Sequence, residues 1–596
     1  MPLDFRNTNT LWTSLLVETL RRLGLRSVVI SPGSRSTPLT VAFAAAVGID
    51  AVPVLDERSA AFFALGQARR MGQAVALVCT SGTAGANYYP AVIEARESRV
   101  PLLILTADRP PELRHSNAGQ TIDQQKLYGT YPNWYAEVAV PSKEDRMLAY
   151  LRQTVIYAWE RSHHPVPGAV HLNLPFRDPL PPLLDPNVQA LEEEFDVDTF
   201  FAGLPPRIAH RPAFGDASSV GVALPQMLEE CRACDRGLII AGVAQPPDPK
   251  GYCEAIVRLS YYLNFPVLAE GLSPVRNYAA LNPCLVSTYD AILRHPARAQ
   301  QLAPEVVIRI GEMPTSKVLR QWLQAMNPRQ WVIDPGDRNL DPTHGRTTHL
   351  RLSVDQLVAS GSLGDSQTIP SPFLRDWLTA EAQMRQRIDQ TFAQVKDLVE
   401  SKIAWLLSQH LPQGTPLFIA NSMPVRDVEW FWQPGDRAIR PFFNRGANGI
   451  DGTLSTALGI AHRNQSSVLL TGDLALLHDT NGFLLRPQLK GHLTIILVNN
   501  GGGGIFEMLP IAQFDPPFEK YFATPQAVEF KALCTTYGVG YEQIKSWEHL
   551  VQCLNPLPEQ GMRVLEVGGD DSGELRTRRQ RDARWRQALF KEFSAS

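Results

Sequence analysis

Two short apolar runs in the last third of the sequence each end in residues that can bind a metal ion. Residues 467–470 (SVLL) lead to Asp473, and residues 493–498 lead to an asparagine pair and four glycines. Such runs, separated by a segment of helix length, predict two parallel strands joined by a crossover helix. Because the carboxyl ends of parallel strands meet at one edge of a sheet, we expect Asp473 and Asn500 to face one crevice. A carboxylate, an amide oxygen and a glycine-lined backbone suit Mg²⁺ that holds a phosphate group. An ordinary strand–helix–strand unit with polar loop ends is the alternative.

An alternating pattern of strands and helices positions these side chains. In the first third of the chain, buried strands followed by small or polar turns and helical patterns are expected at 27–30, 51–55, 74–79 and 100–106. The pattern recurs with strands at 237–241, 266–269, 306–310 and 331–334, and again, after a long helical pattern at 372–409, with strands at 416–420 and 563–567. The predicted fold class is α/β, with three doubly wound parallel-sheet domains whose loops gather at the carboxyl ends of the strands.

Two segments without a periodic pattern divide the chain into three parts. Residues 179–212 are rich in Pro, Asp and Glu, and residues 360–371 are rich in Ser, Gly and Pro, so both are interpreted as linkers, not as packed elements. The predicted domains are 1–185, 205–360 and 372–596. A charged helical pattern near the C-terminus, at 574–586, is interpreted as a solvated face.

Composition limits the class of protein. The 596 residues exceed what one hydrophobic core supports, and 44% hydrophobic with 20% charged residues is typical of globular proteins. A formal net charge of −3 gives no basic footprint for nucleic acid. We find no secretory signal and no apolar run near the roughly 20 residues of a membrane helix. Seven scattered cysteines are expected to be reduced thiols, which predicts a cytoplasmic protein, and the lone Cys231–Cys234 pair is interpreted as helix packing.

The spacing of the two strand ends resembles the metal–diphosphate signature of thiamine-diphosphate-dependent enzymes, in which a GDG triplet precedes an asparagine pair. Here 24 residues lie between Leu474 and Asn499. Leu474 replaces the last glycine of the triplet, but Asp473 stands at the ligand position. The resemblance makes Asp473, Asn500 and the carbonyl of Gly502 the ligands of Mg²⁺ or Mn²⁺. The three parts of the chain would then be the Pyr, central and PP domains of that family.

The first part of the chain carries a second match to this family. Glu57 and the later turn at 80–87 (TSGTAGAN) resemble the family's glutamate and its TSGPGATN-like turn, with Thr83 and Ala84 in place of Pro-Gly. The resemblance implies that Glu57 hydrogen-bonds the pyrimidine ring of the cofactor and relays the activating proton, which makes it the predicted catalytic residue. The alternative is a carboxylate at a helix N-terminus that meets the helix dipole.

Four further segments resemble one branch of the family closely. They are 31–39 (SPGSRSTPL), 106–114 (TADRPPELR), 421–426 (NSMPVR) and 444–452 (NRGANGIDG). That branch decarboxylates 2-oxoglutarate and adds the resulting carbanion to isochorismate in a 1,4 sense. The products are 2-succinyl-5-enolpyruvyl-6-hydroxy-3-cyclohexene-1-carboxylate and CO₂, in menaquinone or phylloquinone biosynthesis. The resemblance therefore predicts a transferase with these two small-molecule substrates.

Each of these substrates carries two carboxylates, and arginine binds planar carboxylates through two parallel hydrogen bonds. By resemblance, the substrate-binding residues are Ser34, Arg35, Arg109, Gln120, Lys317, Ser422, Arg426, Arg445, Phe506 and Leu509. The cofactor-binding residues are, on the same basis, Glu57, Ser422, Ile450, Asp473, Asn500, Gly502 and Ile505. Val318 stands where the branch commonly has an arginine and Gly119 where it often has an asparagine, which leaves the roles of these two positions open. For any single arginine the alternative is a surface ion pair, and for the apolar residues it is core packing.

The resemblance also implies at least a homodimer, or a dimer of dimers, because in this family the cofactor bridges the Pyr domain of one subunit and the PP domain of another. Two enzymatic alternatives stay open, namely an acetolactate synthase-like enzyme, whose central domain would hold a flavin, and a 2-oxo-acid decarboxylase. A non-catalytic protein of this fold is a third interpretation, but it would have no use for Glu57, Asp473 and Asn500 together. No histidine is needed as a base, so His115, His171 and His478 are expected to be structural.

Overall fold

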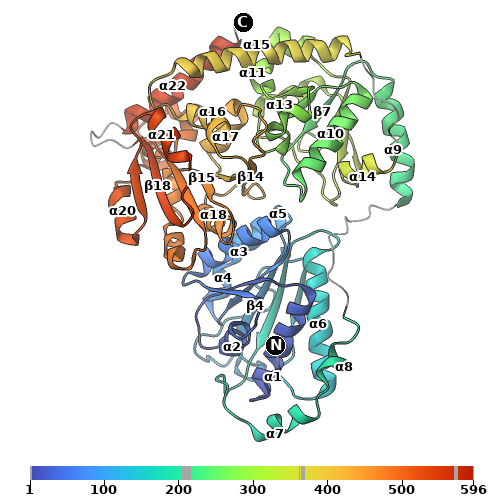
Figure 1. Ribbon diagram of the computed structural model, residues 1–596, viewed down its shortest axis with the longest axis vertical. Coiled ribbons are helices and arrows are strands. Elements are labelled where there is room, and N and C mark those ends of the chain that lie inside the picture. The colour runs from blue at the N-terminus through green and yellow to red at the C-terminus, as the bar shows by residue number, and fades with distance from the viewer. Residues whose placement is uncertain (1–2, 205–216, 362, 364–368, 569–574, 595–596) are drawn as a thin grey trace. The chain divides into compact units, whose positions relative to one another are not determined.

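The computed structural model describes residues 3–204, 217–361, 363, 369–568 and 575–594 (Figure 1). The chain divides into two compact units, which are described separately. Unit 1 consists of Met1–Arg211, Asn444–Asn464 and His478–Gly491. Unit 2 consists of Pro212–Phe443, Gln465–Leu477 and His492–Ser596. Three parallel six-stranded sheets lie within the three predicted domain ranges, and the division into three domains itself stays a prediction.

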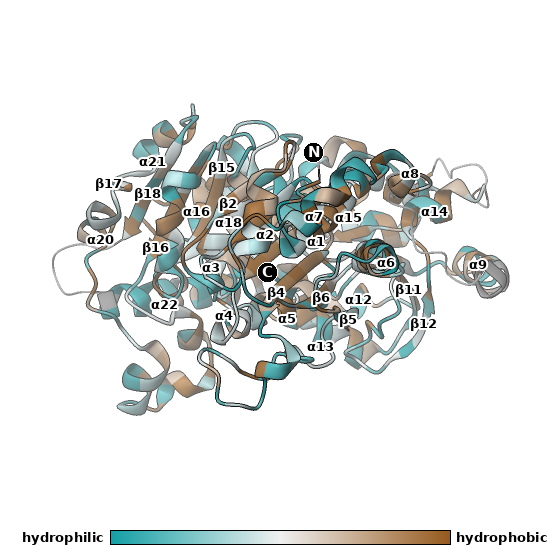
Figure 2. Cartoon of the chain, turned by 90° about the horizontal axis from the view of Figure 1, so that it is seen from below, coloured by the Kyte–Doolittle hydropathy of each residue, from teal (hydrophilic) through white to brown (hydrophobic). Residues whose placement is uncertain are grey.

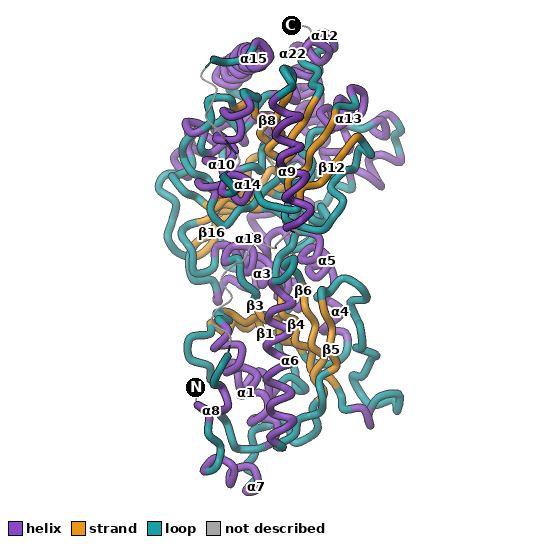
Figure 3. Tube along the Cα trace, turned by 90° about the vertical axis from the view of Figure 1, so that its right-hand side faces the viewer, coloured by secondary structure: helices purple, strands orange, loops and turns teal. Residues whose placement is uncertain are grey.

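Unit 1 is built on a sheet with the strand order β2-β1-β3-β4-β6-β5. Its strands are β1 (Ser27–Ile30), β2 (Asp50–Pro53), β3 (Val75–Cys79), β4 (Leu102–Asp108), β5 (Trp134–Glu137) and β6 (Ala169–Pro175). The main helices are α1 (Thr8–Leu23), α2 (Thr37–Ala44), α3 (Glu57–Met71), α4 (Thr83–Asn87), α5 (Tyr89–Glu97), α6 (Asp145–His163) and α18 (Thr453–Ala461). Figure 3 shows α1 and α6 as purple helices beside the orange strands.

Unit 2 contains two sheets. The first has the order β12-β11-β10-β7-β8-β9 and comprises β7 (Gly237–Ala241), β8 (Val267–Ala269), β9 (Leu285–Val286), β10 (Val306–Ile310), β11 (Arg329–Ile333) and β12 (Arg346–Leu350). The second has the order β14-β13-β15-β16-β18-β17 and comprises β13 (Pro416–Ile419), β14 (Arg440–Phe442), β15 (Ser467–Gly472), β16 (His492–Asn499), β17 (Gly540–Gln543) and β18 (Gly561–Gly568). Counted along the chain, this second sheet repeats the strand order of the unit 1 sheet.

Helices pack around these two sheets. Those associated with the first are α9 (Ala217–Arg232), α10 (Pro249–Leu263), α11 (Tyr289–Leu293), α12 (Pro296–Gln301), α13 (Lys317–Met326) and α14 (Val354–Ala359). The remainder are α15 (Pro372–Gln394), α16 (Glu400–His410), α17 (Met423–Phe431), α19 (Asp473–Leu477), α20 (Phe530–Tyr537), α21 (Trp547–Leu554) and α22 (Leu575–Ser594). No described helix is long and apolar enough to cross a membrane.

The central strands are apolar along their whole length because parallel strands are covered by helices on both faces. β3, β4, β15 and β16 are buried at nearly every position. Figure 2 shows brown strands such as β4 behind helices with teal residues. The strands expected from the sequence are present, with ends within about two residues, as is usual for such assignments. The sequence analysis missed six other strands, namely β5, β6, β9, β12, β14 and β17.

In unit 1, α3 packs against α18 at very short range, which small residues permit. A Cβ atom placed on Gly66 would lie 2.0 Å from the backbone oxygen of Thr456, and one on Gly459 would lie 2.1 Å from that of Phe63. Both distances are far below a van der Waals contact, so each helix needs a glycine at this point. The short approach brings residues 444–464 into the same compact unit as the start of α3.

Three expectations from the sequence are wrong. Residues 179–204 are not a plain linker, because they form the short helices α7 (Pro186–Gln189) and α8 (Val197–Phe201) and bury Val188 and Phe201 in the unit 1 core. The long helical pattern at 372–409 is two helices, α15 and α16. The connection between β15 and β16 is the short α19 and a 3₁₀ segment, Thr480–Gln488, in place of one helix.

A fourth error concerns the C-terminal helix. We expected residues 574–586 to present a solvated face, but α22 buries Arg579, Asp582 and Arg586 to 2% exposure each. Charge alone misled here, because a charged residue can be buried when it meets partners of opposite charge. Of the interpreted linker at 360–371, residues 362 and 364–368 lie outside the described residues.

Candidate active site

Asp473 and Asn500 follow two neighbouring strands of unit 2. β15 and β16 pair in parallel, with Gly472 opposite Val498, so both strands end at the same edge of the sheet. Asp473 is the first residue of α19, Asn500 follows β16 directly, and both side chains are buried. The strand order reverses between β13 and β15, which is where open α/β sheets bind their ligands. The edge expected from the sequence is therefore present in the fold.

The Asn500 side chain has one satisfied and one unsatisfied end. Its Nδ2 donates to Glu400 Oε1 at 2.8 Å, and because a carboxylate only accepts, the NH₂ group must face Glu400. Its Oδ1 is buried and has no hydrogen-bond partner among the described residues. A buried amide oxygen without a partner is costly, and a bound cation would satisfy it. The residues present thus fit a metal ion at this position.

The Asp473 carboxyl lies close to the glycine loop. Burial raises its pKa to about 7, while the backbone N–H groups of Leu474 and Gly502 act in the opposite direction. A buried carboxylate with so few neutralising partners is the type of group that a divalent cation stabilises.

The loop of residues 501–504 approaches other backbone closely. Gly502 has a φ of 138°, and a Cβ atom there would lie 2.3 Å from the oxygen of Ala523. The N–H of Gly503 donates to that same oxygen at 2.7 Å. Only glycine fits this conformation and this space, which explains why a glycine run follows Asn500.

In unit 1, Glu57 occupies the turn between β2 and α3. It is the first residue of α3, and Asp56 caps the helix by accepting from the N–H of Arg58 at 2.8 Å. Asn481 Nδ2 donates to Asp56 Oδ2 at 2.6 Å and holds the turn from the other side. Burial, and also the charge of Glu57, raises the pKa of the Cys79 thiol, which places Glu57 near the end of β3. Glu57 is half-buried, and its carboxylate also meets the N-terminal end of the helix dipole.

Arg35 and Arg109 are neighbours at the carboxyl edge of the unit 1 sheet. Burial, and then the positive charge of Arg109, lowers the pKa of Arg35. Arg35 Nη1 donates to the Phe176 oxygen at 2.9 Å and lies 3.6 Å from the exposed Asp178 carboxylate, while its buried Nε has no partner in the described structure. Two neighbouring guanidinium groups, one of them with an unsatisfied N–H, could bind an anion at this edge.

Gln120 and Ser34 belong to the same edge. Gln120 Nε2 donates to the Ser81 oxygen at 3.0 Å, and its φ of 55° is unusual for a residue other than glycine. Arg109 Nη2 donates to the backbone oxygen of Gly119 at 2.9 Å, so the Gly119 backbone helps to hold the Arg109 side chain. Ser34 is exposed in the turn after β1. The loops expected to bind substrate in unit 1 thus gather at one place.

Residues 444–452 carry Arg445 and Ile450 and are anchored within unit 1 by Glu94 of α5. The buried Glu94 carboxylate accepts from the N–H groups of Gly446 and Ala447 at 3.0 and 2.7 Å. Arg69 Nη2 also reaches Glu94 at 3.2 Å. Arg445 and Ile450 are half-buried on this fixed loop.

The remaining predicted residues belong to unit 2. Ser422, in the turn after β13, has a φ of 70°, which is a strained conformation. Its backbone oxygen accepts from Arg426 Nη1 at 2.6 Å. Lys317 is exposed at the first turn of α13, on the other sheet of this unit. Ile505 and Phe506 lie in the 3₁₀ turn Gly504–Met508, directly after the glycine loop, and the following Leu509 is 43% exposed. An apolar wall beside the glycine loop is consistent with this placement.

Comparison with known proteins extends over the whole chain. Residues 12–127 match the family described as thiamine pyrophosphate enzyme, N-terminal TPP binding domain, and residues 224–419 match the family described as middle domain of thiamine pyrophosphate. Proteins named 2-succinyl-5-enolpyruvyl-6-hydroxy-3-cyclohexene-1-carboxylate synthase are 60% identical in Trichormus variabilis, over 100% of this chain and 99% of the relative, and 59% identical in Gloeothece citriformis, over 100% of both. A synthase of the same name from a Synechococcus strain is 55% identical over 99% of this chain and 98% of the relative. The chain belongs to this synthase family. It is an enzyme of the thiamine-diphosphate-dependent class.

Three residues near the carboxyl edge of β15 and β16 could not be found by sequence reasoning. Glu400 accepts from Asn500, Arg579 donates to the backbone of the glycine loop, and Arg586 donates to Glu400. None of the three lies in a recognisable motif. Glu94 was missed for the same reason. The sequence shows these residues only as charges within helical patterns, and such a pattern does not indicate which residue a charge contacts.

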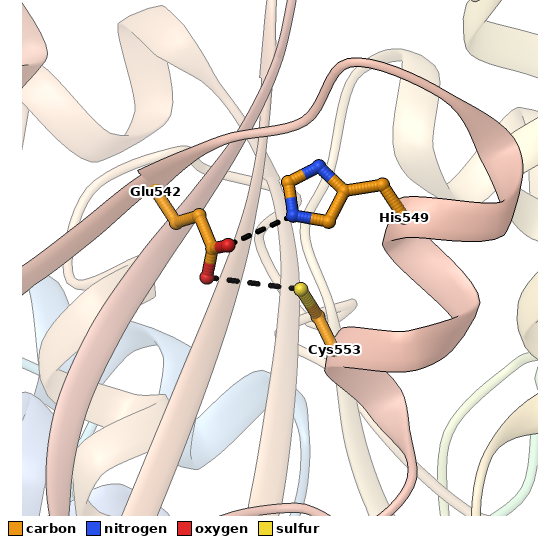
Figure 4. A group of neighbouring side chains, drawn as sticks. All are labelled: Glu542, His549 and Cys553. Carbon is orange, nitrogen blue, oxygen red and sulfur yellow. Dashed lines mark hydrogen bonds and ion pairs between the residues drawn. The ribbon is translucent and has the colours of Figure 1, made fainter.

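Glu542, His549 and Cys553 form a second group of possible metal ligands in the synthase, at the surface of unit 2 (Figure 4). His549 Nε2 lies 2.8 Å from Glu542 Oε1, and the Cys553 thiol donates to Glu542 Oε2 at 3.7 Å. Arg563 is close enough for the charges of Cys553 and Glu542 to act on its pKa. Both oxygens of the Glu542 carboxylate therefore already have a partner within the group.

Proposed function

We propose that this enzyme decarboxylates 2-oxoglutarate and adds the resulting acyl-anion equivalent to isochorismate in a 1,4 sense. The products would be 2-succinyl-5-enolpyruvyl-6-hydroxy-3-cyclohexene-1-carboxylate and CO₂, a step of menaquinone or phylloquinone biosynthesis. The observation that carries the proposal is the 60% identity, over the whole chain, to relatives that bear the name of this synthase. The neighbouring Arg35 and Arg109 of unit 1 support it as well, because both substrates are dicarboxylates and arginine suits carboxylates.

Thiamine diphosphate, when bound, supplies the electron sink for loss of CO₂ from a 2-oxo acid. Glu57 would accept or donate the proton at the pyrimidine ring. Its half-buried position at the start of α3, in the turn after β2, supports this role. Ile450, on the loop that Glu94 anchors, would pack against the cofactor.

Asp473, Asn500 and the Gly502 carbonyl would hold Mg²⁺ or Mn²⁺ against the diphosphate. The unpartnered Oδ1 of Asn500 and the buried carboxyl of Asp473 support this assignment, since a bound cation would offset the burial of both. Ser422, in the turn after β13, and Ile505, in the turn after the glycine loop, would complete the cofactor contacts.

The substrate carboxylates would bind to arginines. Arg35 and Arg109 form the pair in unit 1, with Ser34 and Gln120 as hydrogen-bonding neighbours, and Arg445 lies on the anchored loop. From unit 2, Arg426, Lys317 and Ser422 would add polar contacts, and Phe506 and Leu509 an apolar wall.

Three further proposals extend this assignment. The predicted ranges 1–185, 205–360 and 372–596 would be the Pyr, central and PP domains. Because in the family that this chain resembles the cofactor bridges the Pyr domain of one subunit and the PP domain of another, a homodimer or a dimer of dimers would hold it. A cytoplasmic location is supported by the seven cysteines, all of which are free thiols, since reduced thiols are typical of that compartment.

The decisive experiment incubates the purified protein with 2-oxoglutarate, isochorismate, thiamine diphosphate and Mg²⁺. We expect isochorismate to be consumed and CO₂ to be released in equal amounts, and both to stop when any one component is left out. Turnover of pyruvate without loss of isochorismate would overturn the proposal in favour of an acetolactate synthase-like enzyme or a decarboxylase. A yellow protein with flavin absorbance would point to the former.

A further inference from the structure

The C-terminal helix α22 lies beside α16 and contacts the turn Gly504–Met508 that follows the glycine loop (Figure 1). On its buried face it carries Arg579 and Arg586, which are hidden from solvent even though the helix is dominated by charged residues. An arginine is buried only where several acceptors surround its five N–H donors. The partners of these two arginines therefore show what the helix holds in place.

Arg579 joins three separate segments around the glycine loop. Its Nη1 donates to the backbone oxygen of Gly501 at 2.9 Å, its Nε donates to Glu507 Oε1 at 2.8 Å, and its Nη2 donates to Glu519 Oε2 at 2.6 Å. Glu507 belongs to the 3₁₀ turn after the loop, and Glu519 begins the turn Glu519–Ala523. One buried guanidinium thus holds together the glycine loop, the turn Gly504–Met508 and the turn Glu519–Ala523.

The loop also contacts the backbone of the turn Glu519–Ala523. The N–H of Gly503 donates to the oxygen of Ala523, in the turn that Glu519 begins. A Cβ atom on Gly502 would lie 3.3 Å from Arg579 Nη1 as well as 2.3 Å from the Ala523 oxygen. The Gly502 backbone is therefore confined between the guanidinium and this turn, which leaves its carbonyl little freedom of direction.

Arg586 acts on Asn500 through a carboxylate. Its Nη2 lies 2.7 Å from Glu400 Oε2 and 2.7 Å from Asp427 Oδ2, and its Nε donates to Asp427 Oδ1 at 3.0 Å. The other oxygen of Glu400 accepts from Asn500 Nδ2. Arg586 thereby holds Glu400 in place, and Glu400 turns the amide of Asn500 so that Oδ1 faces the crevice.

Stability alone is a poor explanation of this network. Buried ion pairs of this kind contribute little net stability compared with well-packed apolar residues of similar size. Both arginines instead act on residues that follow β16, at the carboxyl edge of the sheet. Groups that hydrogen-bond the ligands of a metal ion orient those ligands, and their loss weakens metal binding.

We propose that Arg579 and Arg586 of α22 are positioning residues for the metal–diphosphate loop, Arg579 through the backbone of Gly501 and Gly502 and Arg586 through Glu400 and Asn500. The proposal rests on the proposed function in so far as a metal ion and thiamine diphosphate bind at this edge. It assigns to the C-terminal helix a role in cofactor retention.

The test measures Mn²⁺ binding by electron paramagnetic resonance in the presence of thiamine diphosphate and without substrate. Arg579→Lys is the deciding variant, because lysine keeps the positive charge between Glu507 and Glu519 but cannot reach all three acceptors at once. We expect the dissociation constant of Mn²⁺ to rise roughly 10- to 100-fold in Arg579→Lys and in Arg586→Lys. At saturating Mn²⁺ and cofactor, kcat should return to near the wild-type value, which separates weak retention from lost chemistry.

Arg584→Lys is the matched control, since Arg584 is exposed on the same helix, and its Mn²⁺ binding should equal that of the wild type. Unchanged Mn²⁺ binding in both buried-arginine variants would overturn the proposal. Loss of the folded circular dichroism spectrum in Arg579→Lys would assign that arginine a structural role and would overturn it too. If the wild-type protein itself bound no Mn²⁺ with thiamine diphosphate, the proposed cofactor role would fail first, which distinguishes the two failures.

Discussion

Asn500 donates its side-chain amide to Glu400, one hundred positions earlier in the sequence, at 2.8 Å. This single hydrogen bond decides which end of the amide faces the crevice at the ends of β15 and β16. It leaves the amide oxygen of Asn500 free to bind a cation at this edge, and it depends on a residue that no motif identifies.

Replacing Glu400 by glutamine should reverse that orientation. The carbonyl of the introduced glutamine would face Arg586, which only donates, so its NH₂ group would face Asn500 and turn the amide around. Since an NH₂ group cannot bind a cation, the dissociation constant of Mn²⁺ with thiamine diphosphate should rise roughly 10- to 100-fold. Glu559→Gln, at an exposed position, is the control. Equal Mn²⁺ affinity in the two variants would count against the role of Glu400.

Glu57→Gln should keep cofactor binding and lose most of the turnover. Glutamine fills the same space at the start of α3 but cannot transfer a proton, and general acid–base groups contribute about 10²- to 10⁴-fold to rate. The measurement compares kcat with the dissociation constant of thiamine diphosphate, with Glu160→Gln on the exposed face of α6 as control. Wild-type turnover in Glu57→Gln would remove Glu57 from the mechanism.

Arg445→Ala should weaken the use of the dicarboxylate substrates more than it weakens cofactor binding. A hydrogen bond to a charged group contributes about 2 kcal/mol, so kcat/KM should fall roughly 30-fold. Steady-state kinetics with 2-oxoglutarate and with isochorismate will show which substrate Arg445 serves. Arg486→Ala, at an exposed position of the same unit, should leave both values unchanged. Identical kinetics in the two variants would refute the assignment of Arg445.

Gly66→Ala should destabilise unit 1. The added methyl group would lie 2.0 Å from the Thr456 oxygen, so α3 and α18 would have to move apart. Overpacking of this kind costs about 1–3 kcal/mol, measurable as a lower midpoint of denaturant unfolding. Gly435→Ala is the control, because no atom lies within 4 Å of a Cβ atom at that position. A stability loss of the same size in both variants would show that the helix contact is not the cause.

The ion cluster around Asp50 should give unit 1 a stability that depends on pH. Burial raises the pKa of Asp50, but hydrogen bonds from His462, Arg463 and Lys490 outweigh it and hold the pKa well below the ordinary value. A depressed carboxyl pKa adds stability that is complete above the unfolded value, at about pH 4, and is lost as the pH falls further.

Asp50→Asn should therefore unfold more easily at neutral pH, by about 1 kcal/mol, because Arg463 and Lys490 are exposed and water screens their charges. The difference from the wild type should shrink below about pH 4, as Asp50 itself takes up a proton. Thermal unfolding at several pH values measures both effects, and Asp376→Asn serves as the exposed control. A difference that stays constant with pH would contradict the charge-based explanation.

The strands and the turns after them could be predicted from the sequence because their signals are local. An apolar run such as residues 467–470 indicates a buried strand whatever surrounds it, and polar residues at its end indicate an exposed edge. That is why Asp473, Asn500 and the loops of Arg35 and Arg109 lie at the carboxyl edges where we expected them.

Partners far apart in the sequence could not be predicted in this way. The Pro- and acid-rich composition of the segment before residue 204 predicts no packing, yet Val188 and Phe201 reach a core built by α1 and β6. The break between α15 and α16 also had no clear signal, since the apolar period continues across it.

By itself, the sequence determined the α/β class, the likeness to thiamine-diphosphate-dependent enzymes and the residue types at the strand ends, because these follow from short-range pattern and motif. Only the tertiary structure decided that Arg579 and Arg586 are buried beside the loop that follows β16 and that Glu400 orients Asn500. The physical reason is that burial of a charge depends on which opposite charges the fold brings to it, and those lie 60 to 186 residues away along the chain.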